Sequence, residues 1–419
     1  MNLKIFAELI DDQTKEQIDT IVKRFPHNNE KIRIMPDCHL GKGSCIGFTE
    51  ELTFGFVDPA FVGVDIGCGV SAFIFKTNKK IDYEKLDNFI TNNIPHGFSI
   101  NQNTKNYDLQ YSQTSMGIYN SRRIEDICNK LNIDYEKVKK SLGSLGGGNH
   151  FIELSYDESE NFYALIVHSG SRNFGLKVAN HYINISKTAK KERRDLLLRD
   201  AISQAKKRGE FKEINNIIKE IDEIAENWIP ENCINIFNSG YFEDMQTVQE
   251  FARINRYVML DKIMNFIREE FDIKLYGDSL SYVDTPHNYL EYRRWETKAE
   301  DRVIILRKGA ISANAGEAVL IPFNMREGTI LAIGKGNNDW NRSAPHGAGR
   351  ILSRTKANEQ LKDSNVSEIM NGIYTSTAQE CIDELPDAYK PIDKILPLLS
   401  ETVNVIRTFK PLYNFKAKN

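Results

Sequence analysis

Histidines gather in short glycine-rich segments, and these segments hold the residue types with the most chemistry to offer. Five of the eight histidines stand beside Gly, Asn, Asp, Ser or Pro: His39, His150, His168, His287 and His346. They lie in PDCHLGKG (36–43), LGGGNHFIE (145–153), VHSGSR (167–172), DTPHNYLEY (284–292) and APHGAGR (344–350). Polar loops that are far apart in sequence often meet at one site on a rigid scaffold. We therefore expect one site that collects several imidazoles.

A sixth segment, VGVDIGCG (62–69), adds ligands of another kind. Asp65 and Cys68 are three residues apart and flanked by glycines, so a bend turns both side chains toward one point. A carboxylate, a thiolate and imidazoles suit a divalent metal, zinc by ligand softness or manganese if oxygen donors dominate. The alternative is a buried structural cysteine in a tight turn, which ranks first for Cys68 taken alone.

Two glycine-rich loops and three basic residues beside such loops suit phosphate. LGGGNH and HGAGR offer backbone N–H groups that can cradle an anion. Lys42, Arg172 and Arg350 add positive charge that pairs with phosphate oxygens. The chain has no GxxxxGK[ST] loop. Tight turns with solvated basic residues are the alternative for each loop on its own.

His346 has no acidic residue close by in sequence, and its neighbours Pro345, Gly347, Ala348 and Gly349 are small. Space around the ring suits a histidine that attacks phosphorus as a nucleophile. It equally suits a fifth metal ligand, and the residues alone do not choose between the two roles.

Short strands and helices must position these segments. Residues 31–75, 141–175 and 275–350 are predicted to form short strands. Over 245–267, apolar residues at three- and four-residue steps predict a helix with one buried face. The most charged segment, 186–228, is basic and then acidic, and it predicts a solvated helical hairpin broken near Gly209 rather than an RNA-binding arm. We expect an α/β (α+β) fold: one compact domain over 1–419, with β-sheets lining a central cleft, helices outside and the hairpin as an insertion.

Composition excludes several classes of protein. The 419 residues are 41% hydrophobic with a net charge of −3, which gives no global attraction to nucleic acid, so any polyanion site must be local. No apolar run reaches the roughly 18–20 residues that span a bilayer, and the N-terminus does not read as a signal peptide. Six scattered cysteines do not suggest a disulfide framework. We expect a soluble cytoplasmic protein.

Taken together, these segments resemble the RNA-splicing ligase (RtcB) family of tRNA-splicing and RNA-repair ligases. The resemblance runs in order through MPDCHLGKG, VGVDIGCG, GSLGGGNHFIEL, HSGSR, DTPHN, LRKGAISANAGE, IPFNM, SAPHGAGRILSR and KPLYNFK. It implies a ligase that joins an RNA 3′-phosphate, or a 2′,3′-cyclic phosphate opened first, to a 5′-hydroxyl. The implied co-substrate is GTP, the implied cofactor is a pair of Mn²⁺ ions, and the implied intermediate is a covalent histidine–GMP.

The resemblance also assigns residues. It makes His346 the guanylylated nucleophile, Glu153 the guanine partner, and Lys42, Arg172 and Arg350 candidates for RNA or pyrophosphate contacts. The implied metal ligands, with Cys68 bridging, are Asp65, Cys68, His150, His168 and His287. The implied guanylate pocket is Asn149, His150, Phe151, Ile152, Glu153, His287, Asn288, Pro322, Phe323, Asn324, Met325, Thr329, His346, Gly347, Ala348, Gly349 and Lys416.

The sequence departs from the family pattern where Phe323 and Asn324 replace the usual Gly and Ser, and where the chain continues beyond Lys416. A metal-dependent phosphoesterase acting on RNA termini, with Asp37 and His39 as a D-x-H pair, is the alternative function. A non-catalytic RNA-binding protein ranks lower. The resemblance leaves open which RNA is joined and whether an archease-type activator is needed; we expect a monomer.

Overall fold

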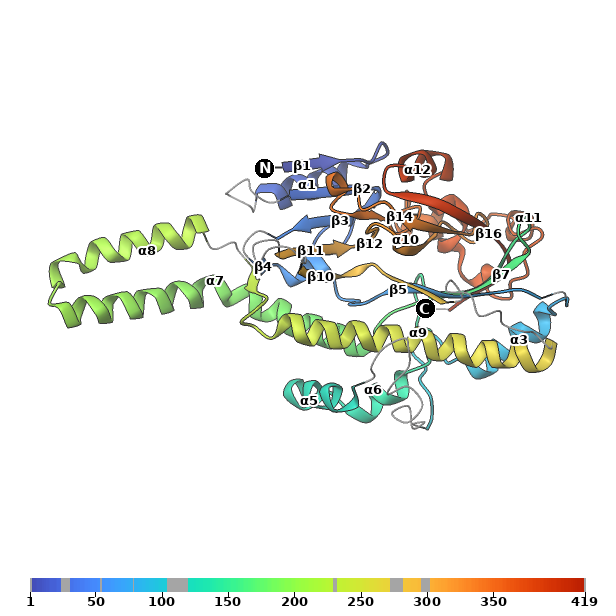
Figure 1. Ribbon diagram of the computed structural model, residues 1–419, viewed down its shortest axis with the longest axis horizontal. Coiled ribbons are helices and arrows are strands. Elements are labelled where there is room, and N and C mark those ends of the chain that lie inside the picture. The colour runs from blue at the N-terminus through green and yellow to red at the C-terminus, as the bar shows by residue number, and fades with distance from the viewer. Residues whose placement is uncertain are drawn as a thin grey trace.

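The computed structural model describes residues 2–23, 31–52, 55–77, 79–103, 120–228, 232–271, 282–294 and 302–417, with residues 193, 196, 224–228, 293, 294 and 302 described by backbone alone. In these ranges the chain is a mixed α/β protein in which two large sheets lie among helices (Figure 1). The expected fold class is confirmed. None of the helices in the described ranges is long and apolar enough to cross a bilayer.

The first sheet is built largely from the N-terminal segment. Its strand order is β1 (Asn2–Ile5), β2 (Lys31–His39), β3 (Ile46–Glu51), β11 (Arg302–Lys308) and β10 (Asn288–Arg294). β2 and β3 pair antiparallel with a register shift between Ile34 and His39. The irregular end of β2 therefore carries the PDCH motif.

The second sheet has seven strands, each antiparallel to its neighbours. The order is β13 (Ala318–Pro322), β14 (Thr329–Gly334), β16 (Val403–Lys416), β6 (Phe151–Asp157), β7 (Phe162–Ser169), β5 (Gly69–Phe75) and β9 (Tyr282–Pro286). The edge strands approach each other, because the Leu320 N–H of β13 donates to Thr285 Oγ1 of β9 at 3.0 Å. The sheet thus curls around an apolar interior that includes Val70, Ile166 and Leu331. Two small pairs complete the strands: β12 (Ala310–Ser312) with β15 (Ser343–Pro345), and β4 (Phe56–Val57) with β8 (Ile234–Asn235).

Helices cover the sheets from both sides. α9 (Tyr241–Phe271) lies along the second sheet, where Met259 and Ile263 pack with Leu165 and Val167 of β7 (Figure 1). The helix predicted over 245–267 is therefore confirmed. Near α9 lie α3 (Tyr83–Asn93), α5 (Ser121–Leu131) and α6 (Tyr135–Ser141). The other α-helices of the body within the described ranges are α1 (Asp12–Lys23), α2 (Pro59–Val62), α10 (Arg354–Leu361), α11 (Val366–Ile369) and α12 (Ile392–Leu399).

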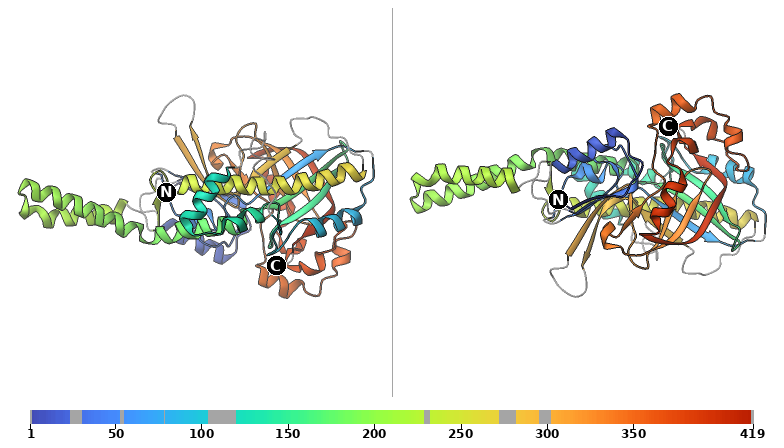
Figure 2. Two further views of the ribbon diagram at one scale, coloured as in Figure 1. Left: turned by 90° about the horizontal axis from the view of Figure 1, so that it is seen from below. Right: turned by 90° about the horizontal axis from the view of Figure 1, so that it is seen from above.

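A helical hairpin projects from the body (Figures 1 and 2). α7 (Arg172–Arg208) ends where Gly209 adopts φ 73°, and α8 (Ile214–Trp228) runs back along it, with Arg194 Nε 2.7 Å from Asp222 Oδ1. α7 begins well before the charged segment, so the β-like reading of 141–175 was wrong at its end. The first turns of α7 are anchored by the buried residues Phe174, Val178 and Tyr182.

Candidate active site

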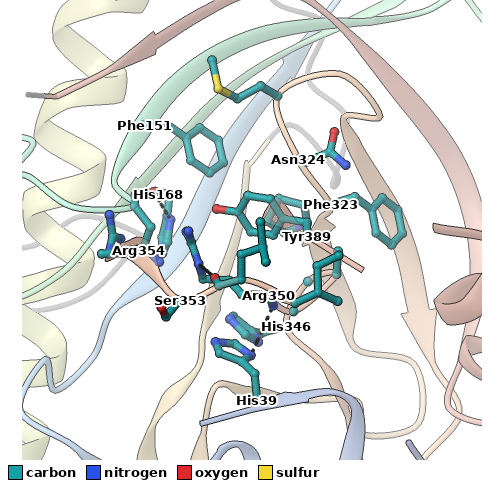
Figure 3. Close-up of a pocket in the computed structure, with 18 of the residues that line it drawn as sticks. His39, Phe151, His168, Phe323, Asn324, His346, Arg350, Ser353, Arg354 and Tyr389 are labelled. Atoms are coloured by element: carbon teal, nitrogen blue, oxygen red, sulfur yellow. Dashed lines mark hydrogen bonds between the residues drawn. The ribbon is translucent and has the colours of Figure 1, made fainter. Parts of the chain in front are cut away.

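A cavity of about 690 Å³ opens between the curled second sheet, the end of β2 and the segment after β15 (Figure 3). Among the sequence-predicted residues, Asn149, Phe151, Glu153, His168, His287, Pro322, Phe323, Asn324, Met325, His346, Gly347, Ala348, Gly349, Arg350 and Lys416 line it. Asp65, Cys68 and His150 do not line this cavity.

Strand register explains why the metal-ligand candidates meet. The turn 65–68 precedes β5, His168 lies near the end of β7, and His287 follows β9. These three strands are hydrogen-bonded neighbours whose ends are in register. His150 immediately precedes β6, which pairs with β7. Four segments that are distant in sequence therefore place these side chains together at the ends of neighbouring strands of the second sheet.

The side chains at these strand ends form two groups that share the Cys68 thiol. Cys68 Sγ lies 3.5 Å from His150 Nε2 and 3.3 Å from His168 Nε2, while Asp65 Oδ2 lies 3.3 Å from His150 Nε2. The ligand atoms of Cys68, His168 and His287 lie within 4.8 Å of one another, and so do those of Asp65, Cys68 and His150. The structure thus brings all five predicted ligands together, with Cys68 common to both groups.

Backbone carbonyls orient two of the three imidazoles. His150 Nδ1 is 2.9 Å from the Leu145 carbonyl oxygen and His168 Nδ1 is 3.1 Å from that of Asn149. A neutral ring that donates from Nδ1 directs the Nε2 lone pair at the cluster, the usual support for a metal-binding histidine. The buried Nδ1 of His287 has no hydrogen-bond partner among the described residues. Buried polar atoms are rarely left unsatisfied, so this donor set fits one or two bound cations.

Electrostatics agree with cation binding. Burial holds the pKa values of His168 and His287 well below their usual range, so both rings stay neutral. Burial alone would raise the pKa of Asp65, but polar contacts with His150, Cys68 and the Ser171 N–H together lower it. Burial, with Asp65 adding to it, raises the pKa of the Cys68 thiol well above normal. A cation would convert that thiol to a thiolate ligand.

His346 is held by a buried carboxylate from β2. Asp37 Oδ2 lies 2.6 Å from His346 Nδ1 and also accepts the His346 backbone N–H at 3.1 Å. Asp37 is fully buried, whereas the His346 side chain is 17% exposed and lines the cavity. The His346 and His287 ring centres are 4.8 Å apart. An imidazole whose Nδ1 is fixed in this way has Nε2 free for chemistry beside the ligand cluster.

A metal-dependent phosphoesterase would need Asp37 and His39 as metal ligands, but both side chains have other partners. The Asp37 carboxylate is committed to His346, and His39 Nδ1 lies 3.0 Å from the Asp37 carbonyl oxygen. Burial lowers the pKa of His39 to about 4. Neither residue belongs to a metal-ligand group in the described ranges.

A second buried carboxylate, Glu153, lies at the far side of the cavity. Its Oε1 accepts from Ser155 Oγ at 2.6 Å and its Oε2 from Asn414 Nδ2 at 3.0 Å. Burial raises the pKa of Glu153 to about 7. Nearby, Lys416 Nζ is 3.0 Å from Glu384 Oε2 and 5.1 Å from the Phe151 ring centre. The cavity therefore ends in a carboxyl group, a lysine and an aromatic face.

Four predicted pocket residues do not line the cavity, and one of them, His150, belongs to the ligand cluster. Ile152 is buried in the hydrophobic core, and Thr329 is buried at the start of β14. Asn288 joins two segments instead: its Nδ2 donates to the Asp65 carbonyl at 3.1 Å and its Oδ1 accepts from the Gly309 N–H at 2.9 Å. Asn288 therefore supports the turn 65–68 instead of lining the cavity.

Phe323 and Asn324, which depart from the family pattern, lie on one wall of the cavity (Figure 3). Phe323 is 4% exposed and packs in the cluster around Ile321 and Ala348. Asn324 Oδ1 accepts the backbone N–H groups of Arg326 and Glu327, each at 2.9 Å. Asn324 therefore closes the turn between β13 and β14.

Of the three basic candidates, the structure brings only Arg350 to the cavity. Its guanidinium pairs with Glu384 Oε1 at 2.9 Å and donates to the Asp383 carbonyl. Arg172 lies behind the ligand loops, where it donates to Ser144 Oγ at 3.1 Å and to the Gly97 carbonyl at 2.7 Å. Lys42 is exposed and outside the lining.

Sequence comparison places the chain among known proteins. A model of the family described as tRNA-splicing ligase RtcB matches residues 20–417. The chain belongs to the RtcB family. It is 28% identical to the RNA-splicing ligase RtcB of Escherichia coli K12 over 422 residues, covering 95% of this chain and 92% of that protein. The tRNA-splicing ligases RtcB of Nanoarchaeum equitans and Thermococcus kodakarensis are 26% and 25% identical, with 98% of this chain covered in each case. The family resemblance seen in the motifs is confirmed.

Several residues at this RtcB site were missed from the sequence. Asp37 had been named only for the phosphoesterase alternative, although it lies in a segment of the family resemblance. Asn414, which holds Glu153, lies in another such segment, KPLYNFK. Arg354, which pairs with Glu384 at 3.0 Å, is the last residue of the segment SAPHGAGRILSR. Tyr389, which lines the cavity and donates to Glu384, lies in none of the segments of the resemblance.

Proposed function

We propose that the chain is a GTP- and Mn²⁺-dependent RNA ligase of tRNA splicing or RNA repair, joining a 3′-phosphate or 2′,3′-cyclic phosphate end to a 5′-hydroxyl. Membership of the RtcB family supports RNA ligation. The observation that carries the proposal is His346, oriented through Nδ1 by Asp37 and 4.8 Å from a histidine of the ligand cluster. With Nδ1 held by Asp37, Nε2 is free to act as a nucleophile, and among the described residues His346 belongs to neither ligand group.

In the proposed first step, His346 Nε2 attacks the α-phosphorus of GTP. The N–P bond forms as the bond from the α-phosphorus to its bridging oxygen breaks, and pyrophosphate leaves. The ring gains positive charge in this step, which the Asp37 carboxylate at 2.6 Å stabilises. An RNA 3′-phosphate oxygen then takes GMP from the histidine. Finally the 5′-hydroxyl attacks the 3′-phosphorus, loses its proton, and GMP leaves.

We propose that Asp65, Cys68 and His150 hold one Mn²⁺ and that Cys68, His168 and His287 hold a second. When bound, the ions neutralise charge on phosphate oxygens and help to align them. Burial keeps the imidazoles of His168 and His287 neutral and keeps Cys68 a thiol before binding. A bound cation would deprotonate that thiol. A 2′,3′-cyclic phosphate end is opened by water before ligation.

The guanylate is proposed to lie along the cavity from His346 to Glu153. An ionised Glu153 accepts both N1–H and N2–H of guanine, whereas adenine offers no such pair of donors. Lys416 and the Phe151 ring flank the same region, with Pro322 to Met325 as one wall and 346–349 as the other. Asn149 lies at the metal end. Ile152, Asn288 and Thr329 contribute by supporting these residues.

Arg350 is proposed to contact RNA or pyrophosphate phosphates from the cavity wall, while Arg172 supports the ligand loops and Lys42 reaches RNA outside the cavity. The proposed partner is RNA, with an archease-type activator as an additional requirement to be tested. We keep a single domain over 1–419, a monomeric state and a cytoplasmic location as proposals.

The deciding experiment is the intact mass of the protein after incubation with GTP and Mn²⁺, beside His346→Ala. One acid-labile GMP adduct, absent from the variant, is expected because a phosphoramidate bond is cleaved by acid. Unmodified protein with metal bound and GTP intact would overturn the proposed nucleotidyl transfer. An RNA with a 2′,3′-cyclic phosphate end then distinguishes strand joining from the phosphate removal that the phosphoesterase alternative predicts.

A further inference from the structure

Two consecutive buried polar residues of α9, Asn255 and Arg256, lie against the segments that carry the ligand cluster. Both side chains are fully buried. α9 passes alongside β5 in Figure 1. Gly67 has φ 72°, and a Cβ there would lie 2.7 Å from Gln249 Cα of α9. The ligand turn and α9 are therefore in direct backbone contact.

Arg256 connects three ligand-bearing segments. Its Nη1 donates to the Gly67 carbonyl at 2.8 Å and to the Ser169 carbonyl at 2.9 Å. Gly67 precedes Cys68, and Ser169 follows His168. Its Nε and Nη2 lie 3.0 and 2.8 Å from Asp284 Oδ1, three residues before His287, and Nε also donates to Ser71 Oγ at 2.8 Å.

Asn255 connects the remaining segment. Its Oδ1 accepts the N–H groups of Gly143 at 2.7 Å and Ser144 at 3.1 Å. Its Nδ2 donates to the Ser144 and Gly170 carbonyls at 3.0 and 3.1 Å, and to Ser169 Oγ at 3.2 Å.

A short chain of hydrogen bonds leads from this amide to a ligand. The Ser169 hydroxyl donates to the Leu145 carbonyl at 2.8 Å, and the same carbonyl lies 2.9 Å from His150 Nδ1. Asn255 thus acts on His150 through Ser169 and Leu145.

Burying an arginine costs free energy that good geometry and full pairing must offset. An apolar contact with the sheet would hold α9 in place without that cost, as Met259 and Ile263 already do. Arg256 instead directs Nη1 to main-chain oxygens within one residue of Cys68 and His168, and Asn255 directs its amide to the loop before His150 and to Ser169 and Gly170. Rigid support of this kind determines how well ligands converge on a metal.

We propose that Asn255 and Arg256 are positioning residues that set the spacing of the two ligand groups. The inference rests on the proposed metal site. Arg256 fixes the Cys68 turn relative to His168 and, through Asp284, to the strand that leads to His287. Asn255 fixes the loop that carries His150. One turn of α9 therefore holds in place the four segments on which both proposed ion sites depend.

The test is a Co²⁺ titration of the metal-free full-length protein, followed by thiolate-to-cobalt and d–d absorption. Arg256→Lys keeps the charge but loses the planar fork that reaches two carbonyls and Asp284 together. We expect its Co²⁺ dissociation constant to rise about 10- to 100-fold, with a changed d–d spectrum. The matched control is Arg33→Lys, because Arg33 is also buried and bonds main-chain carbonyls, but those of Asn2, Ile32 and Asp339.

Thermal melting of the metal-free proteins separates positioning from general stability. A lower melting temperature with wild-type cobalt affinity and spectrum in Arg256→Lys would overturn the inference. If Arg256→Lys does not fold, Asn255→Asp is judged by the same criteria, because this isosteric change keeps the acceptor for the Gly143 and Ser144 N–H groups and replaces the Nδ2 donors with a carboxylate oxygen. Wild-type protein that binds no cobalt, or binds it without a thiolate band, would instead overturn the proposed metal site itself.

Discussion

Replacing Asp37 by Asn tests the proposed mechanism at one atom. Asn keeps a hydrogen-bond acceptor near His346 Nδ1 but removes the negative charge that faces the ring at 2.6 Å. The Asp37 side chain is fully buried and that of His346 is 17% exposed, so water screens the pair weakly. Breaking a buried ion pair costs about 3–5 kcal/mol, and we take the lower end because the acceptor remains.

A loss of about 3 kcal/mol in the transition state corresponds to a rate roughly 100-fold lower. The assay is single-turnover formation of the His346–GMP adduct, followed by intact mass at saturating GTP and Mn²⁺. Because Asp37 touches the nucleophile and not the nucleotide, the adduct rate should fall while the GTP concentration for half-maximal rate stays within about twofold.

The matched control is Asp12→Asn, the same chemical change at the rim of the same cavity, where the Asp12 side chain is 98% exposed. Its adduct rate should stay within about twofold of wild type, as for most surface substitutions. An Asp37→Asn rate within about tenfold of wild type, in folded protein, would refute the stabilising role given to this carboxylate.

Three further predictions concern the metal, the guanine partner and the hairpin. Cys68→Ser should lower bound Mn²⁺ from two ions per chain to one or none by elemental analysis, and two retained ions would contradict the shared thiolate. The pKa of Glu153 is raised to about 7, so its carboxyl becomes protonated as the pH falls below that value and can no longer accept two hydrogen bonds from guanine. The affinity for GMP, measured by calorimetry, should therefore fall between about pH 8 and about pH 6. Glu153→Gln should bind GMP weakly, and its affinity should not change over the same pH range. Replacing residues 190–226 with a short Gly–Ser linker should leave adduct formation unchanged and shift the melting temperature by only a few degrees, because the anchoring contacts of α7 lie before residue 190.

The five ligands were predicted by family motif, and their convergence in the structure follows from strand register. This register could not be predicted from the sequence, because no local pattern of residues indicates that β5, β7 and β9 are neighbours in the sheet. The helix over 245–267 was predictable since its apolar spacing is a local property. The start of α7 at Arg172 was not, because the glycine- and serine-rich segment before it resembles the end of a strand.

Long-range polar pairing limited what the sequence disclosed about individual residues. His346 lacks an acidic neighbour in sequence, yet Asp37 reaches it from 309 positions away. The resemblance predicts Arg350 as a candidate for RNA or pyrophosphate contacts, and the sequence gives no sign that Glu384 pairs with it in the structure. Asn255 is one of many polar residues in helices, and only its hydrogen bonds to the ligand loop distinguish it.

The hairpin also has a mechanical consequence. α7 is a continuous helix of 37 residues, about 55 Å long at 1.5 Å per residue. Its inner end adjoins Ser171, whose backbone N–H donates to Asp65 Oδ1 at 3.3 Å, and its outer end stands clear of the body (Figure 2). The core holds α7 as far as Ala189, so only the 19 residues 190–208 form a free arm, about 28 Å long. A rotation of one degree about Ala189 displaces the tip by about 0.5 Å. The buried turns before Ala189 therefore bear a load at the tip before it reaches the ligand turn.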